Sequence, residues 1–218
     1  MGTITKTILK DREQWLENRT KGIGGSDIAS VIGLNPWRSN IELWEIKTGR
    51  RVQEDISEKP VVKYGTLAEE YLRELFKLDF PEYHFFYEEN NSWHNTDYPW
   101  AQASLDGWLT DKEGRFGVWE CKTTEIVNAM QRDKWKDSIP DSYFCQVLMY
   151  MAVTNAEFAI LKAQLKTRID NNVSLQTKHY FIERSEVEAD IEYLMGKGAE
   201  FWECVVNDTR PAMILPNI

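Results

Sequence analysis

The chain has 218 residues, of which 42% are hydrophobic, and carries 35 Asp and Glu against 26 Lys and Arg, a net charge of −9. This length and composition suffice for one well-buried core, so we expect a single domain over residues 1–218. The acidic balance disfavours a protein that coats nucleic acid non-specifically, although a basic channel within an acidic surface stays compatible with it.

Signals for a membrane or an oxidising compartment are missing from the sequence. No run of about 18 apolar residues occurs and the N-terminus lacks the apolar core of a signal peptide, so we expect a cytoplasmic protein without membrane contact. Cys121, Cys145 and Cys204 lie far apart, without a C-x-x-C pair. This spacing predicts reduced thiols and argues against a zinc or iron–sulfur site held by cysteine alone.

Capping residues and apolar periodicity predict the helices. A glycine-rich turn at residues 21–25 precedes Ser26, a good N-cap for a short helix that Gly33 ends. A polar loop is expected at residues 50–60, and a capping box from Ser185 to Glu188 opens the last helix. The expected helices cover residues 11–19, 27–32, 40–48, 64–78, 141–152 and 185–206.

Strands are predicted mainly in the second half of the chain, with a loop at residues 90–99. The expected strands cover residues 83–88, 100–109, 116–123, 158–165 and 178–181. Helices on both sides of this run of strands indicate an α/β fold, a central mixed β-sheet flanked by helices.

The predicted hairpin of residues 100–123 carries the most informative side chains. Its turn at residues 111–115 sets Asp106 almost opposite Glu120. Glu120 and Lys122 share one strand face, whereas Cys121 points away and leaves its carbonyl beside them. Hard oxygen ligands of this kind suit Mg²⁺ or Mn²⁺. Alternating Glu and Lys is also common on solvated strands, so the pattern alone does not establish a metal site.

Three further side chains admit two interpretations each. Glu69, near the start of its predicted helix, is either a solvated charge or a member of the hairpin site. Gln146 and Tyr150 lie four residues apart on the helix of residues 141–152, at helical spacing within an apolar run. They are either a buried polar pair satisfied in the core or residues that face the hairpin.

The ordered set of motifs resembles the PD-(D/E)xK nucleases, and among them the phage lambda exonuclease and YqaJ-type viral recombinase family. The resemblance runs from about Trp15 to about Tyr150 and keeps the family's order. The matching segments are Gly24-Gly25-Ser26-Asp27, residues 65–70, Ser104-Leu105-Asp106-Gly107 and Glu120-Cys121-Lys122. It implies a restriction-endonuclease-like core.

The resemblance also implies two Mg²⁺ ions per active site, with Mn²⁺ as a possible substitute. Asp106 bridges both ions in this scheme, Glu120 and the Cys121 carbonyl complete one ligand shell, and Glu69 supports the other. Lys122 orients or deprotonates the attacking water, and neighbouring cations are expected to depress its pKa. Gln146 then holds the water or the metal-binding groups, and Tyr150 has a positioning or structural role.

A 5′-phosphate pocket is the second implication. The family's equivalents of Arg19, Ser26 and Ser104 grip the terminal phosphate, and Trp15 and Tyr143 fall at positions near DNA. Exposed backbone N–H groups of the glycine-rich turn suit an anion as well. Taken alone, Ser26 is equally well explained as an N-cap without a ligand.

The implied activity is a Mg²⁺-dependent 5′→3′ exonuclease that acts on double-stranded DNA ends, releases 5′-mononucleotides and leaves 3′ single strands for recombination. The resemblance also implies that the protein assembles into a homotrimeric ring and works with a single-strand annealing protein. It implies a phage or prophage origin and a bacterial host. Alternatives are a RecB- or Cas4-like nuclease without an iron–sulfur cluster, a nuclease-derived DNA-binding module without activity, and an acidic DNA mimic.

Overall fold

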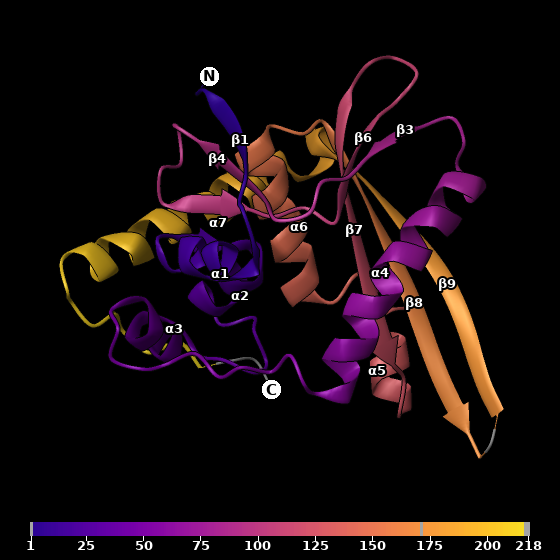
Figure 1. Ribbon diagram of the computed structural model, residues 1–218. Helices are drawn as coiled ribbons and strands as arrows, with labels where there is room; N and C mark the ends of the chain where they lie inside the picture. Colours follow the sequence, from indigo (N-terminus) through magenta and orange to yellow (C-terminus); the bar gives the residue numbers. More distant parts are fainter. Residues whose placement is uncertain (1, 171, 216–218) are drawn as a thin grey trace.

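The computed structural model describes residues 2–170 and 172–215 and contains two sheets separated by a central helix (Figure 1). One sheet has the strand order β1-β4-β5-β2 and the other the order β3-β6-β7-β8-β9. The helices are α1 (Arg12–Thr20), α2 (Gly25–Val31), α3 (Asn40–Lys47), α4 (Pro60–Asp79), α5 (Ala129–Asp133), α6 (Asp141–Thr154) and α7 (Arg184–Val206). The strands are β1 (Ile4–Ile8), β2 (Ile23–Gly24), β3 (His84–Phe86), β4 (Asn91–Asn95), β5 (Ala101–Ala103), β6 (Gly107–Thr110), β7 (Phe116–Glu125), β8 (Phe158–Ile169) and β9 (Asn172–Glu183).

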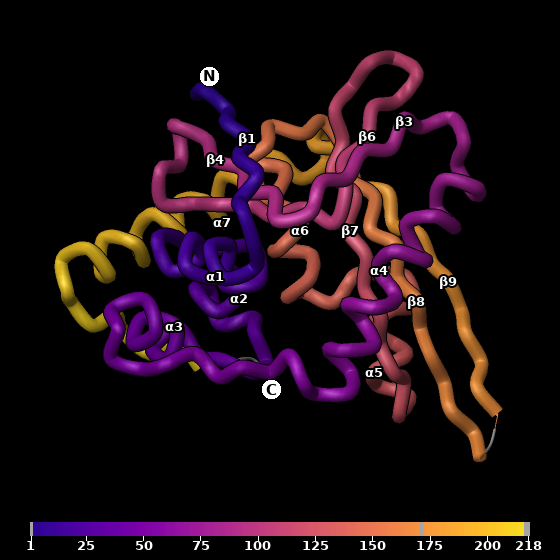
Figure 2. The backbone as a smooth tube through the Cα atoms, viewed as in Figure 1, coloured from indigo at the N-terminus to yellow at the C-terminus, as the bar shows by residue number. Residues whose placement is uncertain are grey.

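The buried apolar residues form two clusters, and helix α6 lies at the centre of the larger one. Every residue from Cys145 to Thr154 is buried, which is the behaviour of a helix that is apolar on all sides. The helix contacts β4 and β5 of one sheet and β7 and β8 of the other, and the backbone trace shows it between them (Figure 2). The prediction of a mixed sheet flanked by helices is confirmed, with a second sheet added.

Helix α4 covers the opposite face of the five-stranded sheet. Leu72 and Phe76 pack there against Trp119, Phe158 and Ile160 in a second apolar cluster. The N-terminal half of the helix comes close to β7, since a Cβ on Gly65 would lie 3.2 Å from the Thr123 hydroxyl oxygen. The helix begins at Pro60, earlier than predicted, so Glu69 lies near its middle and not near its start.

Several predicted strands differ from the structure: the one expected over residues 178–181 is the longer β9, which begins at Asn172, and two larger differences lie within residues 90–109. The strand expected over residues 100–109 is two strands, because the chain crosses from one sheet to the other at residues 104–106. The loop expected at residues 90–99 contains β4, which pairs with β1. Asn91 fixes this segment, because its side chain bonds both the N–H and the carbonyl of Leu105 at 2.9 Å.

Two predicted helix caps are also wrong. Helix α7 begins at Arg184 without a side-chain cap, and Arg184 instead pairs with Glu188 at 2.7 Å. Helix α2 begins one residue before Ser26, so that serine lies in the first turn and is not the N-cap. The three cysteines are free thiols, as predicted. Within the described residues, no helix is long and apolar enough to cross a bilayer.

Candidate active site

The hairpin of β6 and β7 has the register that the sequence predicts. Gly107 pairs with Trp119, so Asp106, one residue earlier, falls beside Glu120. The carboxylate of Asp106 accepts a hydrogen bond from the backbone N–H of Cys121, with 3.0 Å between N and Oδ2. The Cys121 side chain packs in the α4 cluster, away from Glu120, as expected from strand alternation.

Glu120 is the most enclosed carboxylate of the site, with 1% of its surface exposed. Its Oε1 accepts hydrogen bonds from Lys122 Nζ at 2.6 Å and from Gln146 Nε2 at 2.8 Å. Gln146 Nε2 also lies 3.0 Å from the Tyr150 hydroxyl oxygen. Gln146 and Tyr150 therefore face the hairpin. Of the two interpretations, the structure favours this one over a buried polar pair satisfied only within the core.

Glu69 reaches the same cluster from α4. It interacts electrostatically with Asp106, Lys122 and Arg73, so helix and hairpin together contribute three carboxylates. Burial raises the pKa of Glu69 to about 7, and the charge of Asp106 adds to the shift. Burial raises the pKa of Glu120 to about 8, again with Asp106 adding.

Lys122 is the cation that balances these acids. Burial lowers its pKa, but Glu120 and Asp106 outweigh burial and hold the pKa above its usual range. The predicted depression of this pKa refers to the site with divalent cations bound and stays a prediction. The lysine ammonium is a stable positive charge inside the cluster, 5.2 Å from the centre of the Tyr143 ring.

The donor set fits a divalent cation. Glu120 Oε2 is buried and has no hydrogen-bond partner among the described residues, so one carboxylate oxygen lacks a positive or donating neighbour. The raised pKa values of Glu69 and Glu120 come first from burial and then from the charge of Asp106, both of which a bound cation would offset. Within the described residues, no group of three or more His, Cys, Asp or Glu side chains is arranged so that these side chains alone could hold a metal ion.

Arg73 is a residue of this site that sequence reasoning missed. It lies one helical turn after Glu69 and is buried, and its Nη1 donates to the backbone carbonyl of Asp106 at 3.0 Å. The guanidinium carbon lies 3.5 Å from the centre of the Tyr87 ring. Arg73 therefore links α4 to the segment that carries Asp106. Glu69 and Arg73 are four residues apart, which places them on one face of a helix, and this spacing is the sequence signal that could have identified Arg73.

The predicted phosphate-binding residues gather beside the carboxylates. Arg19 Nη2 donates to Ser26 Oγ at 2.6 Å, and Trp15 Nε1 donates to Ser104 Oγ at 2.9 Å. The Arg19 guanidinium lies 4.7 Å from the centre of the Trp15 ring, which joins the two pairs. Ser104 is two residues from Asp106, so the group adjoins the carboxylate cluster.

Asp27 stabilises the segments that carry Arg19 and Ser26, a role that sequence reasoning also missed. It is buried and forms ion pairs with Arg38 at 2.6 Å and Lys47 at 2.9 Å. Its Oδ2 accepts from the Gly24 N–H at 3.2 Å, so that backbone donor of the glycine-rich turn is already used. Lys47 also donates to the carbonyl of Arg19 at 2.9 Å, which fixes the backbone of the arginine.

Close helix packing brings α2 to the site. A Cβ on Gly25 would lie 2.3 Å from Cε1 of Tyr150, so glycine is required for this approach. The packing places Ser26 and Arg19 on the side of α6 that carries Gln146 and Tyr150.

A family model described as the YqaJ-like viral recombinase domain matches residues 14–157, about two thirds of the chain. The chain belongs to this family. The family predicted from the motifs is thus confirmed, and the matched range contains every residue of the site described above.

The chain is 29% identical over 215 residues to a protein named "Uncharacterized protein YqaJ" from Bacillus subtilis (strain 168). The match covers 96% of this chain and 61% of that relative, so the chain spans about three fifths of the relative's length.

Two solved structures have a similar fold. An alkaline exonuclease from Laribacter hongkongensis superposes with a TM-score of 0.62 at 21% identity, over 89% of this chain and 95% of that one. A phage-related exonuclease from Haemophilus somnus 129PT has a TM-score of 0.51 at 11% identity, over 86% and 96%. These likenesses confirm the predicted fold class and show that the chain shares the fold of the two exonucleases.

Proposed function

We propose that the protein is a metal-dependent 5′→3′ exonuclease that acts on double-stranded DNA ends. The observation that carries this proposal is the convergence of Glu69, Asp106, Glu120 and Lys122 from a helix and a hairpin. One of these carboxylates is fully enclosed, with an oxygen that lacks a partner among the described residues. Family membership and the exonuclease-like fold support it.

Glu69, Asp106, Glu120 and the Cys121 carbonyl are the residues that would hold two Mg²⁺ ions, for which Mn²⁺ can substitute. When bound, such ions supply Lewis-acid activation of water and neutralise the charge that develops on the phosphate oxygens. The protein supplies a rigid ligand set, because Gln146 and Lys122 both fix Glu120 and the Cys121 N–H fixes Asp106.

Lys122 would orient the attacking water or deprotonate it. Its ammonium donates to Glu120 Oε1 at 2.6 Å, and without bound cations Glu120 and Asp106 hold its pKa above the usual range. A protonated lysine orients water as a hydrogen-bond donor and stabilises a pentacovalent phosphate electrostatically.

The neighbouring group of Arg19, Ser26 and Ser104 would bind the 5′-phosphate of the DNA end. Arg19 is partly buried, its carbonyl accepts a hydrogen bond from Lys47, and its guanidinium contacts Ser26 and Trp15, so the guanidinium is preorganised to donate hydrogen bonds to an anion. Trp15 stacks on this guanidinium, and Tyr143 lies beside Lys122. An end-binding pocket next to the hydrolytic residues favours an exonuclease over an enzyme that cleaves internally.

Products and partners follow from the same proposal. The enzyme would release 5′-mononucleotides and leave a 3′ single strand for a single-strand annealing protein in phage-type recombination. A second structure of the Laribacter hongkongensis protein is a complex with dAMP, a deoxynucleoside monophosphate of this product class. We further propose a homotrimer and action in the cytoplasm of a bacterial host.

Two of the alternative functions are weaker. The three free and separated cysteines do not supply the four-cysteine cluster of some RecB- or Cas4-like enzymes, and the family match over residues 14–157 disfavours the form without a cluster. A non-catalytic DNA-binding module is expected to have lost a carboxylate or the lysine, and all four of these residues are present and in mutual contact or electrostatic range.

Linear duplex labelled at either end tests the polarity and the pocket together. Parent protein with Mg²⁺ is expected to release a 5′-terminal label as mononucleotide at early times, before any 3′-terminal label. Replacing the 5′-phosphate by a hydroxyl slows initiation, and Arg19→Ala removes most of this difference. Early release of the 3′ label contradicts the polarity, and equal rates on both ends in the parent remove the phosphate pocket.

A further inference from the structure

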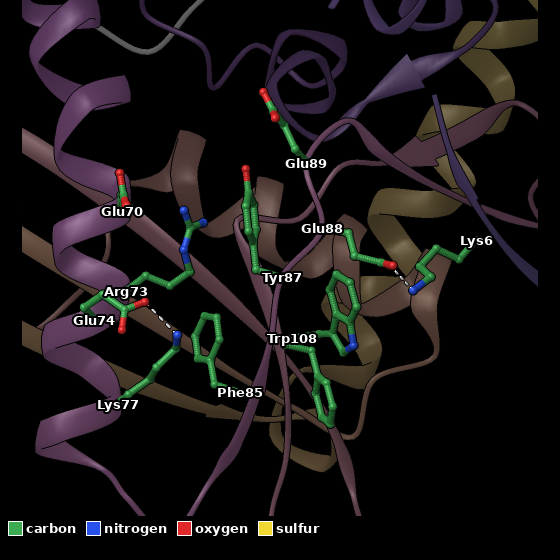
Figure 3. A pocket seen from close by; sticks show the side chains of 11 residues that line it. Lys6, Glu70, Arg73, Glu74, Lys77, Phe85, Tyr87, Glu88, Glu89 and Trp108 are labelled. Atoms are coloured by element: carbon green, nitrogen blue, oxygen red, sulfur yellow. Dashed lines mark hydrogen bonds and ion pairs between the residues drawn. The ribbon is translucent and has the colours of Figure 1, made fainter. Parts of the chain in front are cut away.

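A groove of about 840 Å³, with Arg73 in its lining, lies between α4 and the segment formed by β3 and the loop after it (Figure 3). Side chains of α4 form one wall, and residues 85–89 form the other. Lys6 and Trp108 lie at the far end of the second wall (Figure 3).

The groove follows the open edge of the five-stranded sheet. β3 is the first strand in the order and pairs only with β6. Phe85 lies on the α4 side, 5.8 Å from the Phe76 ring, whereas Phe86 stacks on Trp108 of the other side at 6.3 Å. Because residues of both faces line the groove, it runs along the strand edge, where alternate N–H and C=O groups face outward.

Apolar rings are accessible along this edge. Phe86 has 46% and Tyr87 has 41% of its surface exposed. Both side chains line the groove together with Trp108. A sheet edge bordered by exposed aromatic rings offers backbone pairing and apolar contact to the same extended segment.

The charges in the groove favour a basic segment. The groove cations are engaged within the chain, since Lys6 pairs with Glu88, Lys77 pairs with Glu74, and Arg73 donates to the Asp106 carbonyl. The other two carboxylates of the lining, Glu70 and Glu89, have no ion-pair partner among the described residues, and both are exposed. The lining as a whole carries four carboxylates and three cations, so its net charge is −1, and Glu70 and Glu89 are the carboxylates without an ion pair in the described part of the chain that a cation of a partner could meet.

We propose that this groove binds an extended peptide segment of a partner protein, which adds a strand to β3. Lysine or arginine side chains of the segment would meet Glu70 and Glu89, and its apolar side chains would cover Phe86 and Tyr87. A single nucleic-acid strand also stacks on exposed rings, but its phosphates would be repelled by the two free carboxylates. The proposal is independent of the nuclease activity.

The probe is a short, fluorescein-labelled peptide in which lysine alternates with valine, titrated into the full chain and followed by fluorescence polarisation. Saturable binding is expected, with slower amide hydrogen exchange confined to β3 and the loop after it. The double variant Glu70→Lys/Glu89→Lys is expected to weaken binding roughly tenfold. The control Glu192→Lys/Glu203→Lys makes the same charge change on the exposed side of α7 and leaves the affinity unchanged.

Two more probes separate the possible occupants. A peptide with N-methyl groups on alternate residues cannot complete the added strand, so it is expected to lose most of its affinity. A single-stranded oligonucleotide, titrated into the parent protein, tests the other class of occupant. Oligonucleotide binding by the parent at least as tight as peptide binding, with slower amide exchange at β3, overturns the proposal. Peptide binding that leaves β3 exchange unchanged, or equal peptide affinity in both double variants, overturns it as well.

Discussion

Three carboxylates and one lysine determine the electrostatics of the candidate site. Glu69 and Glu120 have pKa values raised to about 7 and about 8, because both are buried near Asp106. Below these values the two carboxyl groups are protonated and neutral, so a divalent cation must displace protons in order to bind. Above them the groups are charged and the cation binds without this competition.

Affinity for a divalent ion is therefore expected to rise as the pH increases from about 6 to about 9. Isothermal titration of Mn²⁺ in buffers with different ionisation heats measures both the affinity and the protons released. Proton release near pH 7 should vanish above about pH 9. Affinity that is independent of pH, with no released protons, contradicts the assignment of Glu69 and Glu120 as ligands.

Substitutions of Lys122 and of Glu120 are expected to have different effects on hydrolysis and on the binding of divalent ions. Lys122→Gln should slow hydrolysis by about 10²- to 10⁴-fold, because a charged donor to the reacting water is lost. It should leave Mn²⁺ affinity equal or higher, since the ammonium 2.6 Å from Glu120 Oε1 competes with the ion.

The Glu120→Gln variant, by contrast, should lose both hydrolysis and Mn²⁺ binding, because the substitution removes a carboxylate ligand of the ion. Glu113→Gln, on the exposed turn of the same hairpin, serves as the control and should change neither. A Lys122→Gln variant that hydrolyses DNA at the parent rate removes the lysine from the mechanism.

The residues that strand alternation controls were predictable from the sequence. Asp106 opposite Glu120, and Glu120 and Lys122 on one face, follow from a period of two residues and a short turn. Arg73 and Asp27 were not, because their roles depend on contacts with residues far along the chain or on another helix. The direction of the Lys122 pKa shift depends on which charges surround it, which spacing does not give.

Helix α4 and the segment before β6 are joined by Arg73, and this connection is expected to affect the position of Asp106. Arg73→Gln should weaken divalent-ion binding and lower the rate at saturating DNA, while the affinity for DNA ends stays near the parent value. Arg73→Lys should restore only part of the rate, because a lysine does not reproduce the planar stack on Tyr87. Mn²⁺ affinity and the separate kcat and KM values measure this. Unchanged ion affinity in a folded Arg73→Gln protein contradicts the positioning role.

Helices α2 and α3 are joined by the buried ion pairs of Asp27. Burial raises the pKa of this carboxyl, but Lys47, Arg38 and Arg19 outweigh burial and hold it well below its ordinary value near 4. Its contribution to stability is thus fully present above about pH 4 and is lost as the pH falls below that value. Asp27→Asn should lower the free energy of unfolding at pH 7 by about 3–5 kcal/mol.

Urea denaturation of parent and variant at several pH values tests this, with the exposed Asp137→Asn as the control. The difference between parent and Asp27→Asn should shrink at pH values below about 3. A difference that stays constant from pH 7 to pH 2 would show that the carboxylate charge is not the stabilising feature.

Element prediction succeeded where the local pattern was strong and failed where tertiary contacts decided. Helix α6 has a long apolar run and was predicted closely. β4 has the polar sequence Asn91-Ser92-Trp93-His94-Asn95, which favours a loop, and it becomes a buried strand because its side chains bond neighbouring backbone. β1 has the sequence Ile-Thr-Lys-Thr-Ile, apolar only at its two ends, so periodicity does not mark it, and it forms by pairing with β4.

The whole molecule has a net charge of −9, which gives an isolated subunit little long-range attraction for DNA. We expect a ring-shaped trimer, because a ring that encloses duplex holds it without strong phosphate contacts. Light scattering should report about three subunits, and closed circular plasmid should resist digestion while the linearised plasmid disappears. A monomer that degrades linear duplex processively contradicts the ring but leaves the catalytic assignment intact.

The central claim is that the cluster around Asp106 hydrolyses DNA ends with a divalent ion. Release of acid-soluble nucleotide from 5′-phosphorylated linear duplex, measured with Mg²⁺ and with excess chelator, tests it most directly. The parent is expected to digest the duplex only with Mg²⁺, and folded Asp106→Ala protein is expected to lose activity by roughly a thousandfold or more. Digestion that persists in chelator, or a folded Asp106→Ala variant that works at the parent rate, would contradict the claim.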